Sequence, residues 1–176
     1  MNNFFGHLHT VNSHRYLVFK HAVKAGIPLR GLLHDLSKYS PYEFFEGVRY
    51  FQQGTRSPIE KVREIHGYSP AWLHHKGHNR HHFEYWTDYN PKENKIMPVK
   101  IPLAFVKEMI CDRIAASKIY QKEKYTDDFP LNYFLRGIDK YLIHPETSAL
   151  MEKLLRMLAE KGEEETFRYI KQLKEY

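Results

Sequence analysis

The chain has 176 residues, enough for one domain with a hydrophobic core of ordinary size. Its mean hydropathy of −0.63 and the lack of any apolar stretch near ~20 residues argue against a membrane-spanning protein. The formal charge of +6 favours anionic partners such as phosphate esters, nucleotides or nucleic acid. A single cysteine excludes an internal disulfide, and the first residues lack the apolar run of a signal peptide, so we expect a cytoplasmic protein.

Helical signals run through nearly the whole chain. Ser-Pro pairs at residues 40–41, 57–58 and 69–70 each place a capping serine before a proline at the first helical position, and Glu43 and Glu60 complete capping boxes. No alternation of strand type has useful length. We therefore predict an all-α protein with helices near residues 7–25, 29–38, 41–52, 58–66, 70–76, 102–122, 131–141, 146–161 and 163–175.

The segment 87–98, TDYNPKENKIMP, is polar, contains two prolines and is predicted to be an exposed loop. We expect one domain over residues 1–176, with its core over about residues 7–122. The C-terminal helices, over about residues 131–176, have amphipathic spacing that suits packing or a contact in a homo-oligomer.

Three histidines share one face of the first predicted helix. His7, His14 and His21 follow one another at intervals of seven residues. Positions seven apart are separated by about 10.5 Å along a helix axis. Only one of the three can therefore share an ion with side chains from elsewhere.

The second predicted helix ends in the dipeptide His34-Asp35, within LRGLLHDLSK. Neighbouring side chains on a helix diverge by about 100°, yet both reach one cation if other helices bring a histidine and a carboxylate. Lys38 lies one helical turn after His34 and is predicted to face the same cleft.

Residues 72–86, WLHHKGHNRHHFEYW, contain five histidines, two tryptophans, Lys76 and Arg80. Interleaved aromatic and basic residues also suit single-stranded nucleic acid, which stacks on them. Nucleic-acid surfaces, however, use Lys and Arg for phosphates, whereas neutral imidazoles suit transition metals. We interpret the segment as a supply of metal ligands and keep nucleic acid as the main alternative.

Asp112 lies within a hydrophobic stripe of the helix predicted at 102–122, together with Phe105, Met109, Ala116 and Ile119. An ionised carboxylate on a face that packs into the core is strongly unfavourable unless it is paired. Asp112 therefore requires a cation, which is an Arg, a Lys, a protonated His or a metal ion.

The ordered set His14, His34-Asp35 and Asp112 resembles the H…HD…D signature of HD-domain metal-dependent phosphohydrolases. The continuation HDLSK is similar to the HD-x-x-K variant of some phosphodiesterase branches, and segments such as HDLSKYSPYEF and GYSPAWLHHKGHNRHHFEYW resemble an uncharacterised bacterial family of HD-like proteins. The resemblance implies an HD-like helical bundle with a C-terminal helical extension.

The same resemblance implies a divalent ion, Zn, Mn, Fe, Co or Mg, held by His14, His34, Asp35 and Asp112. Superfamily members with two metals add histidines between the HD pair and the final Asp. In this sequence that role falls to His75, His81 or His82.

The function expected from these residues is hydrolysis of a phosphate ester, with nucleotides among the candidate substrates, by a water that the metal activates. Asp35 would orient the water, and Lys38 would stabilise the phosphate charge. Candidate substrate contacts are Arg56, Lys76 and Arg80, with Arg49 and Arg113 as further candidates.

Two alternatives stay open at this point. Some HD-fold proteins hold two irons with four His and two Asp and are oxygenases, and this sequence can supply those ligands. A nonenzymatic module that binds a nucleotide or nucleic acid, with the HD pair satisfied by internal hydrogen bonds, is the other.

Overall fold

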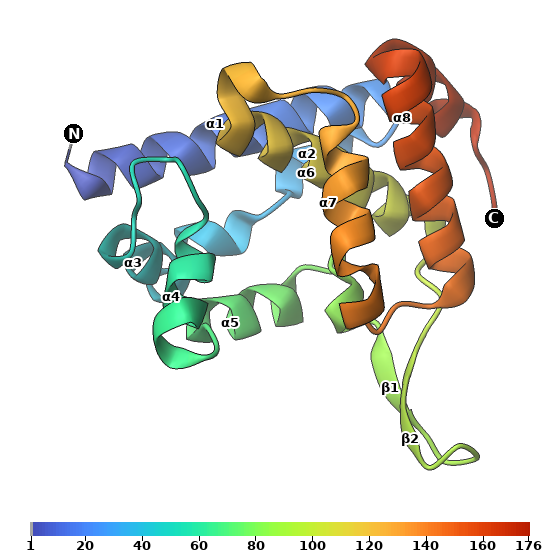
Figure 1. Ribbon diagram of the computed structural model, residues 1–176, viewed down its shortest axis with the longest axis horizontal. Helices are drawn as coiled ribbons and strands as arrows, with labels where there is room; N and C mark the ends of the chain where they lie inside the picture. Colours follow the sequence, from blue (N-terminus) through green and yellow to red (C-terminus); the bar gives the residue numbers. More distant parts are fainter. Residues whose placement is uncertain (1) are drawn as a thin grey trace.

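The computed structural model describes residues 2–176 and is mostly helical, as the sequence predicts (Figure 1). Its longest helices are α1, α6 and α8. The α-helices are α1 (Asn3–Lys24), α2 (Pro28–Leu33), α3 (Pro41–Arg49), α4 (Pro58–His66), α5 (Pro70–His78), α6 (Leu103–Gln121), α7 (Phe129–Gly137) and α8 (Pro145–Gln172). Single 3-10 turns are η1 (Leu36–Tyr39), η2 (Phe83–Tyr85), η3 (Lys122–Lys124) and η4 (Ile138–Lys140).

The three predicted Ser-Pro helix starts are the starts of α3, α4 and α5. Ser40 accepts a hydrogen bond from the backbone N–H of Glu43, and Ser69 accepts one from Trp72. Ser57 makes no such bond, so Pro58, whose fixed φ suits the first helical position, marks the start of α4 without a side-chain cap.

The hydrophobic core lies mainly between α1, α6 and α8. Val18 of α1, Ile114 of α6 and Leu154 of α8 are all fully buried in it. The short helix α2 packs closely on α1 because Gly31 has no side chain: a Cβ there would lie 2.3 Å from the Cβ of Ala22. This close contact positions the end of α2, where the HD pair follows, beside the middle of α1.

The predicted absence of strands is wrong for residues 87–98. Strands β1 (Thr87–Asn90) and β2 (Lys95–Pro98) form an antiparallel hairpin, with Thr87 opposite Pro98 and Tyr89 opposite Ile96. The hairpin projects from the helical body in Figure 1. Each strand has only four residues, too few for a period of two to stand out in the sequence.

The prediction of one helix over residues 29–38 is also wrong, because α2 ends at Leu33 and η1 begins only at Leu36. The two C-terminal helices predicted on either side of Gly162 are both present in α8. They meet at a kink, where the backbone of Gly162 is not helical, with φ of 76° and ψ of 176°. Within residues 2–176, no helix combines the length and the apolar character needed to cross a membrane.

Candidate metal centre

His34 and Asp35 lie in a break between α2 and η1 rather than on a helix. His34 has extended backbone angles, and Asp35 has the left-handed φ of 54°, which is rare for a residue with a side chain. Arg15 of α1 holds the break: its Nε donates to the carbonyl of His34, and its Nη2 donates to that of Leu32, both at 2.8 Å. Both side chains of the pair therefore point into the protein, where each residue is only 1% exposed.

One group of potential ligands brings together four residues from three elements. His14 comes from α1, His34 and Asp35 from the break, and Asp112 from α6. His14 Nε2 lies 3.0 Å from Asp112 Oδ1, and His34 Nε2 lies 3.2 Å from Asp35 Oδ2. One ligand atom from each residue lies within 4.8 Å of all the others. We call this group cluster 1.

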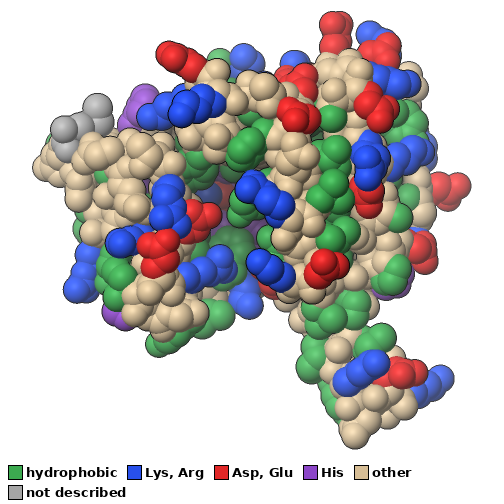
Figure 2. Space-filling model, in the orientation of Figure 1, with side chains coloured by type: hydrophobic (Ala, Val, Ile, Leu, Met, Phe, Trp, Pro, Cys, Tyr) green, Lys and Arg blue, Asp and Glu red, His purple; other side chains and the backbone are tan. Residues whose placement is uncertain are grey.

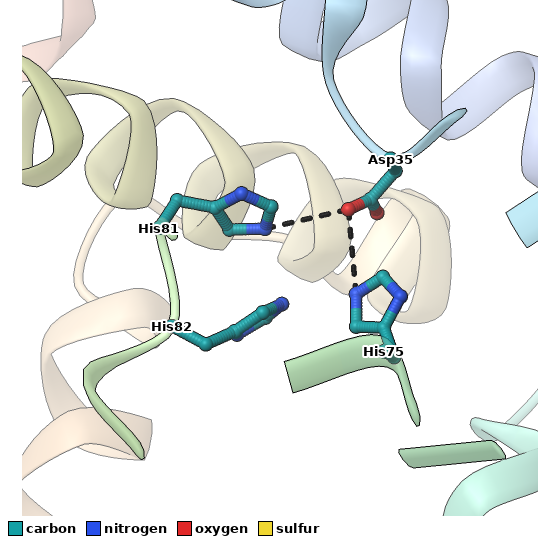
Figure 3. A group of neighbouring side chains, drawn as sticks. All are labelled: Asp35, His75, His81 and His82. Carbon is teal, nitrogen blue, oxygen red and sulfur yellow. Dashed lines mark ion pairs between the residues drawn. The ribbon is translucent and has the colours of Figure 1, made fainter. Parts of the chain in front are cut away.

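A second group, cluster 2, shares Asp35 and adds three histidines. His75 comes from α5, while His81 and His82 follow that helix (Figure 3). His75 Nε2 and His81 Nε2 lie 3.3 Å and 3.4 Å from Asp35 Oδ1. Because Oδ2 faces cluster 1 and Oδ1 faces cluster 2, the Asp35 carboxylate stands between two possible ion positions.

Two glutamates hold the ring orientation of these histidines. Nδ1 of His34 and Nδ1 of His81 lie 3.0 Å and 3.2 Å from the same Oε1 of Glu108. Nδ1 of His75 lies 2.8 Å from Oε2 of Glu43. An imidazole that donates its Nδ1–H to a carboxylate leaves the Nε2 lone pair free for a metal.

Neither glutamate was predicted from the sequence to be part of a site. Glu108 precedes Asp112 by one helical turn and therefore shares its face of α6, a signal that was present in the sequence. Glu43 was recognised only from its capping position. Its contact with His75 depends on the packing of α3 against α5, which no local pattern reveals.

The atoms that face the clusters are short of hydrogen bonds. Among residues 2–176, several buried ring nitrogens and one carboxylate oxygen make none of acceptable geometry: Nε2 of His14, His34, His81 and His82, and Oδ1 of Asp35. Each such buried group costs about 1–3 kcal/mol if nothing binds it. Five of them around one volume fit bound cations, and mixed nitrogen and oxygen donors suit Zn, Mn, Fe or Co.

The charges of the cluster residues also suit metal binding. Burial would raise the pKa of Asp35 and of Asp112, but neighbouring histidines, and Lys38 in the case of Asp35, hold both pKa values well below the usual range. Burial lowers the pKa of His14 and of His82, so both imidazoles are neutral near pH 7. Carboxylates and neutral imidazoles are the forms that bind metal ions.

His34 and His75 are the exceptions among the cluster histidines. For His75, burial would lower the pKa, but Asp35 and Glu43 raise it. His34 shows the same opposition of effects more strongly. Burial would lower its pKa, but Asp35, Asp112 and Glu108 raise it well above the ordinary value. A proton therefore occupies His34 when no ion is present, and metal binding would have to release it.

The other first-helix histidines lie outside both clusters. His21 Nδ1 lies 3.2 Å from the carbonyl of Cys111, and its Nε2 lies 3.9 Å from Glu163. His7 is buried beside Phe44. Of the three histidines, only His14 lies in a group of potential ligands with His34.

All members of the two clusters except His34 line a cavity of about 440 Å³ that opens to the surface. Figure 2 shows a hollow on this face of the molecule, with Lys and Arg side chains around it. Lys38 lines the cavity beside cluster 1, with Nζ 2.6 Å from Asp35 Oδ2. Arg56 lines the cavity but is exposed and paired with Glu60 and Glu64.

Of the other candidate substrate contacts, Lys76, Arg80 and Arg49 do not line this cavity. Arg80 lines a separate depression together with His78 and Arg30. Arg113, in contrast, lines the main cavity. Arg63, Glu84 and several aromatic side chains also line it, and the sequence did not indicate them as a group because they come from five different elements, α4, α5, η2, α6 and α7, and from the segment after η4.

The model of a protein family of unknown function, DUF5662, matches residues 3–157, so the chain belongs to this family. The match includes every residue of clusters 1 and 2. No curated protein and no solved structure matches the chain. Since the family carries no known activity, the function has to be argued from the site itself.

Proposed function

We propose that this DUF5662 protein is a metal-dependent phosphohydrolase of HD type that acts on a phosphorylated small molecule. The observation that carries the proposal is the pair of clusters around Asp35, whose buried donor atoms lack partners at the inner end of a cavity. Cluster 1 would hold one divalent ion and cluster 2 a second, with the two oxygens of Asp35 between them.

Bound divalent ions lower the pKa of a coordinated water and polarise a phosphate oxygen. The chain would contribute the rest of the chemistry. Asp35 would orient the water through its carboxylate, while Glu108 and Glu43 keep the histidine rings aimed at the ions. The burial of both carboxylate-histidine contacts excludes water that would otherwise loosen them.

Lys38 supports a phosphate rather than a neutral substrate. Burial would lower its pKa, but Asp35 and Asp112 raise it, so the ammonium group keeps its charge. That charge now pairs with Asp35. In the metal-bound protein, the Lys38 ammonium group would pair with a phosphate oxygen at the same place.

The test combines metal analysis with a screen of phosphate esters on protein purified without a His-tag. We expect bound divalent metal and release of inorganic phosphate from at least one ester, with both lost after chelation and in Asp35→Asn. The matched control is His21→Ala, which removes a buried histidine of the same helix and should retain both.

Two results would contradict the proposal. Protein without bound metal, even after incubation with divalent ions, would favour the nonenzymatic module. Two irons per chain with oxygen-dependent turnover and no phosphate release would favour the oxygenase.

A further inference from the structure

The cavity has a second set of polar side chains beyond the metal clusters. Glu84 comes from η2 and Arg113 from α6, and both line the same cavity as Asp112. Arg113 directly follows Asp112 in the chain, so this set adjoins cluster 1. Neither side chain belongs to a cluster of potential metal ligands among residues 2–176.

Both side chains have a buried atom without a partner. Glu84 Oε2 and Arg113 Nε make no hydrogen bond in the described part of the chain, and neither residue forms an ion pair within 4.0 Å there. The guanidinium of Arg113 instead lies over the ring of Phe134, at 5.3 Å, and that of Tyr133, at 5.9 Å. A carboxylate and a guanidinium that line one cavity without pairing to each other are expected to bind a polar ligand there.

Aromatic side chains complete the wall around this pair. Trp72, Tyr133 and Tyr141 line the cavity, and the Tyr141 ring lies 4.6 Å from that of Phe83. Aromatic side chains of this kind suit a flat ring, which packs against their edges and uncovered faces. A cavity of about 440 Å³ is also in the size range of sites for small molecules.

We propose that Glu84 and Arg113 form a subsite for a nucleobase whose edge carries adjacent N–H donors beside a carbonyl acceptor, the pattern of guanine. An ionised carboxylate only accepts hydrogen bonds and a guanidinium only donates them. Guanine offers Glu84 the donors of its N1–H and its amino group, and it offers Arg113 the acceptors O6 and N7. Adenine presents an acceptor at N1 and one amino group, so it cannot give Glu84 two donors.

This subsite rests on the proposed function, since it places the phosphate of a guanine nucleotide toward the metal clusters and the base toward Glu84. The two proposals can still be tested separately. Guanosine and adenosine carry no phosphate to hydrolyse, so their binding measures the base subsite alone. Metal content measures the clusters alone.

The experiment is isothermal titration of wild type, Glu84→Gln and Arg113→Gln with guanosine and adenosine. We expect wild type to bind guanosine at least tenfold more tightly than adenosine. Each variant should lose about tenfold or more in guanosine affinity, because an amide replaces one charged group, and neither should lose metal. The matched control is Glu93→Gln, an exposed glutamate at the hairpin turn, which should bind guanosine as wild type does.

Equal affinity of wild type for the two nucleosides, or binding of neither, would overturn the subsite, and these readings do not depend on how the variants fold. Preference for guanosine in a protein that holds no metal would support the subsite and contradict the proposed function. Metal-bound protein that releases phosphate from esters but shows no guanosine preference would support the proposed function and contradict the subsite.

Discussion

Two positions on the buried face of α1 carry the same residue in different settings. His14 and His21 are both buried, and they lie two turns apart on one stripe. His14 faces Asp112 and Asp35, and its Nε2 has no hydrogen-bond partner. His21 has its Nδ1 beside the carbonyl of Cys111. The comparison shows that a buried histidine becomes a candidate ligand through what other helices bring to it, because its own spacing is the same in both cases.

The largest effect is expected from Asp35→Asn. The change keeps the volume of the side chain but removes the negative charge that both clusters share, so both ions should be lost together. We expect metal affinity to fall by more than about 100-fold, beyond the range for loss of a supporting residue, and phosphate release to fall to background. Elemental analysis and a phosphate assay measure the two effects. Retention of metal at wild-type stoichiometry would show that Asp35 is not a ligand shared by the two clusters.

The comparison within α1 is tested by His14→Ala and His21→Ala. His14→Ala should lose the ion of cluster 1, because three ligands remain where four converge. His21→Ala should keep both ions and lose about 1–3 kcal/mol of stability, since it removes a buried side chain together with its contact to the Cys111 carbonyl. Metal titration and chemical denaturation measure these changes. Loss of metal in His21→Ala but not in His14→Ala would place the metal centre two turns further along α1.

A smaller effect is expected for Glu108, which contacts two of the cluster histidines but belongs to neither cluster. Glu108→Gln should weaken metal binding by about 10–100-fold, because it removes the carboxylate that orients His34 and His81. Glu163→Gln is the matched control: Glu163 lies near His21 and pairs with Lys118, and its loss should leave metal affinity unchanged. Equal effects of the two changes would mean that Glu108 acts only on stability.

A separate effect, on stability rather than on metal binding, concerns pH and His21, the α1 histidine near the C-terminal end of the helix. Burial lowers the pKa of His21 to about 4, although the Cys111 carbonyl and Glu163 partly oppose the shift. Below its ordinary pKa of 6.5 the unfolded chain binds a proton that folded His21 does not. Stability should therefore fall as the pH drops from about 6.5 to about 4, by roughly 2–3 kcal/mol from this residue.

The matched measurement is urea unfolding of chelated wild type and His21→Gln across this pH range. The variant should lose less stability than wild type as the pH falls. A pH dependence that is the same in both proteins would mean that His21 is not held neutral in the folded state.

Local signals in the sequence were sufficient for most helices. Ser-Pro pairs predicted the starts of α3, α4 and α5, and Gly162 predicted the break in α8. Local signals failed at Asp35, whose left-handed backbone is stabilised by Arg15, a residue of α1. No propensity of the segment itself predicts that conformation.

The candidate site also has residues that local signals in the sequence indicated and residues that only the tertiary fold brings together. The periodicity of α6 predicted that Asp112 needs a cation, and the structure places His14 at 3.0 Å from it. The placement of His75, His81 and His82 around the other oxygen of Asp35 could not be read from spacing, since the chain turns after α5 before it brings His81 and His82 back. Glu84 and Arg113 lie 29 residues apart and meet only through the tertiary fold.

Metal stoichiometry in wild type and Asp112→Asn tests the account most directly. Elemental analysis of protein purified without a His-tag and saturated with one divalent metal should give two ions per chain for wild type. Asp112→Asn should give one, because Asp112 belongs to cluster 1 but not to cluster 2. No bound ion in wild type, or two ions in both proteins, would contradict the assignment of two clusters that share Asp35.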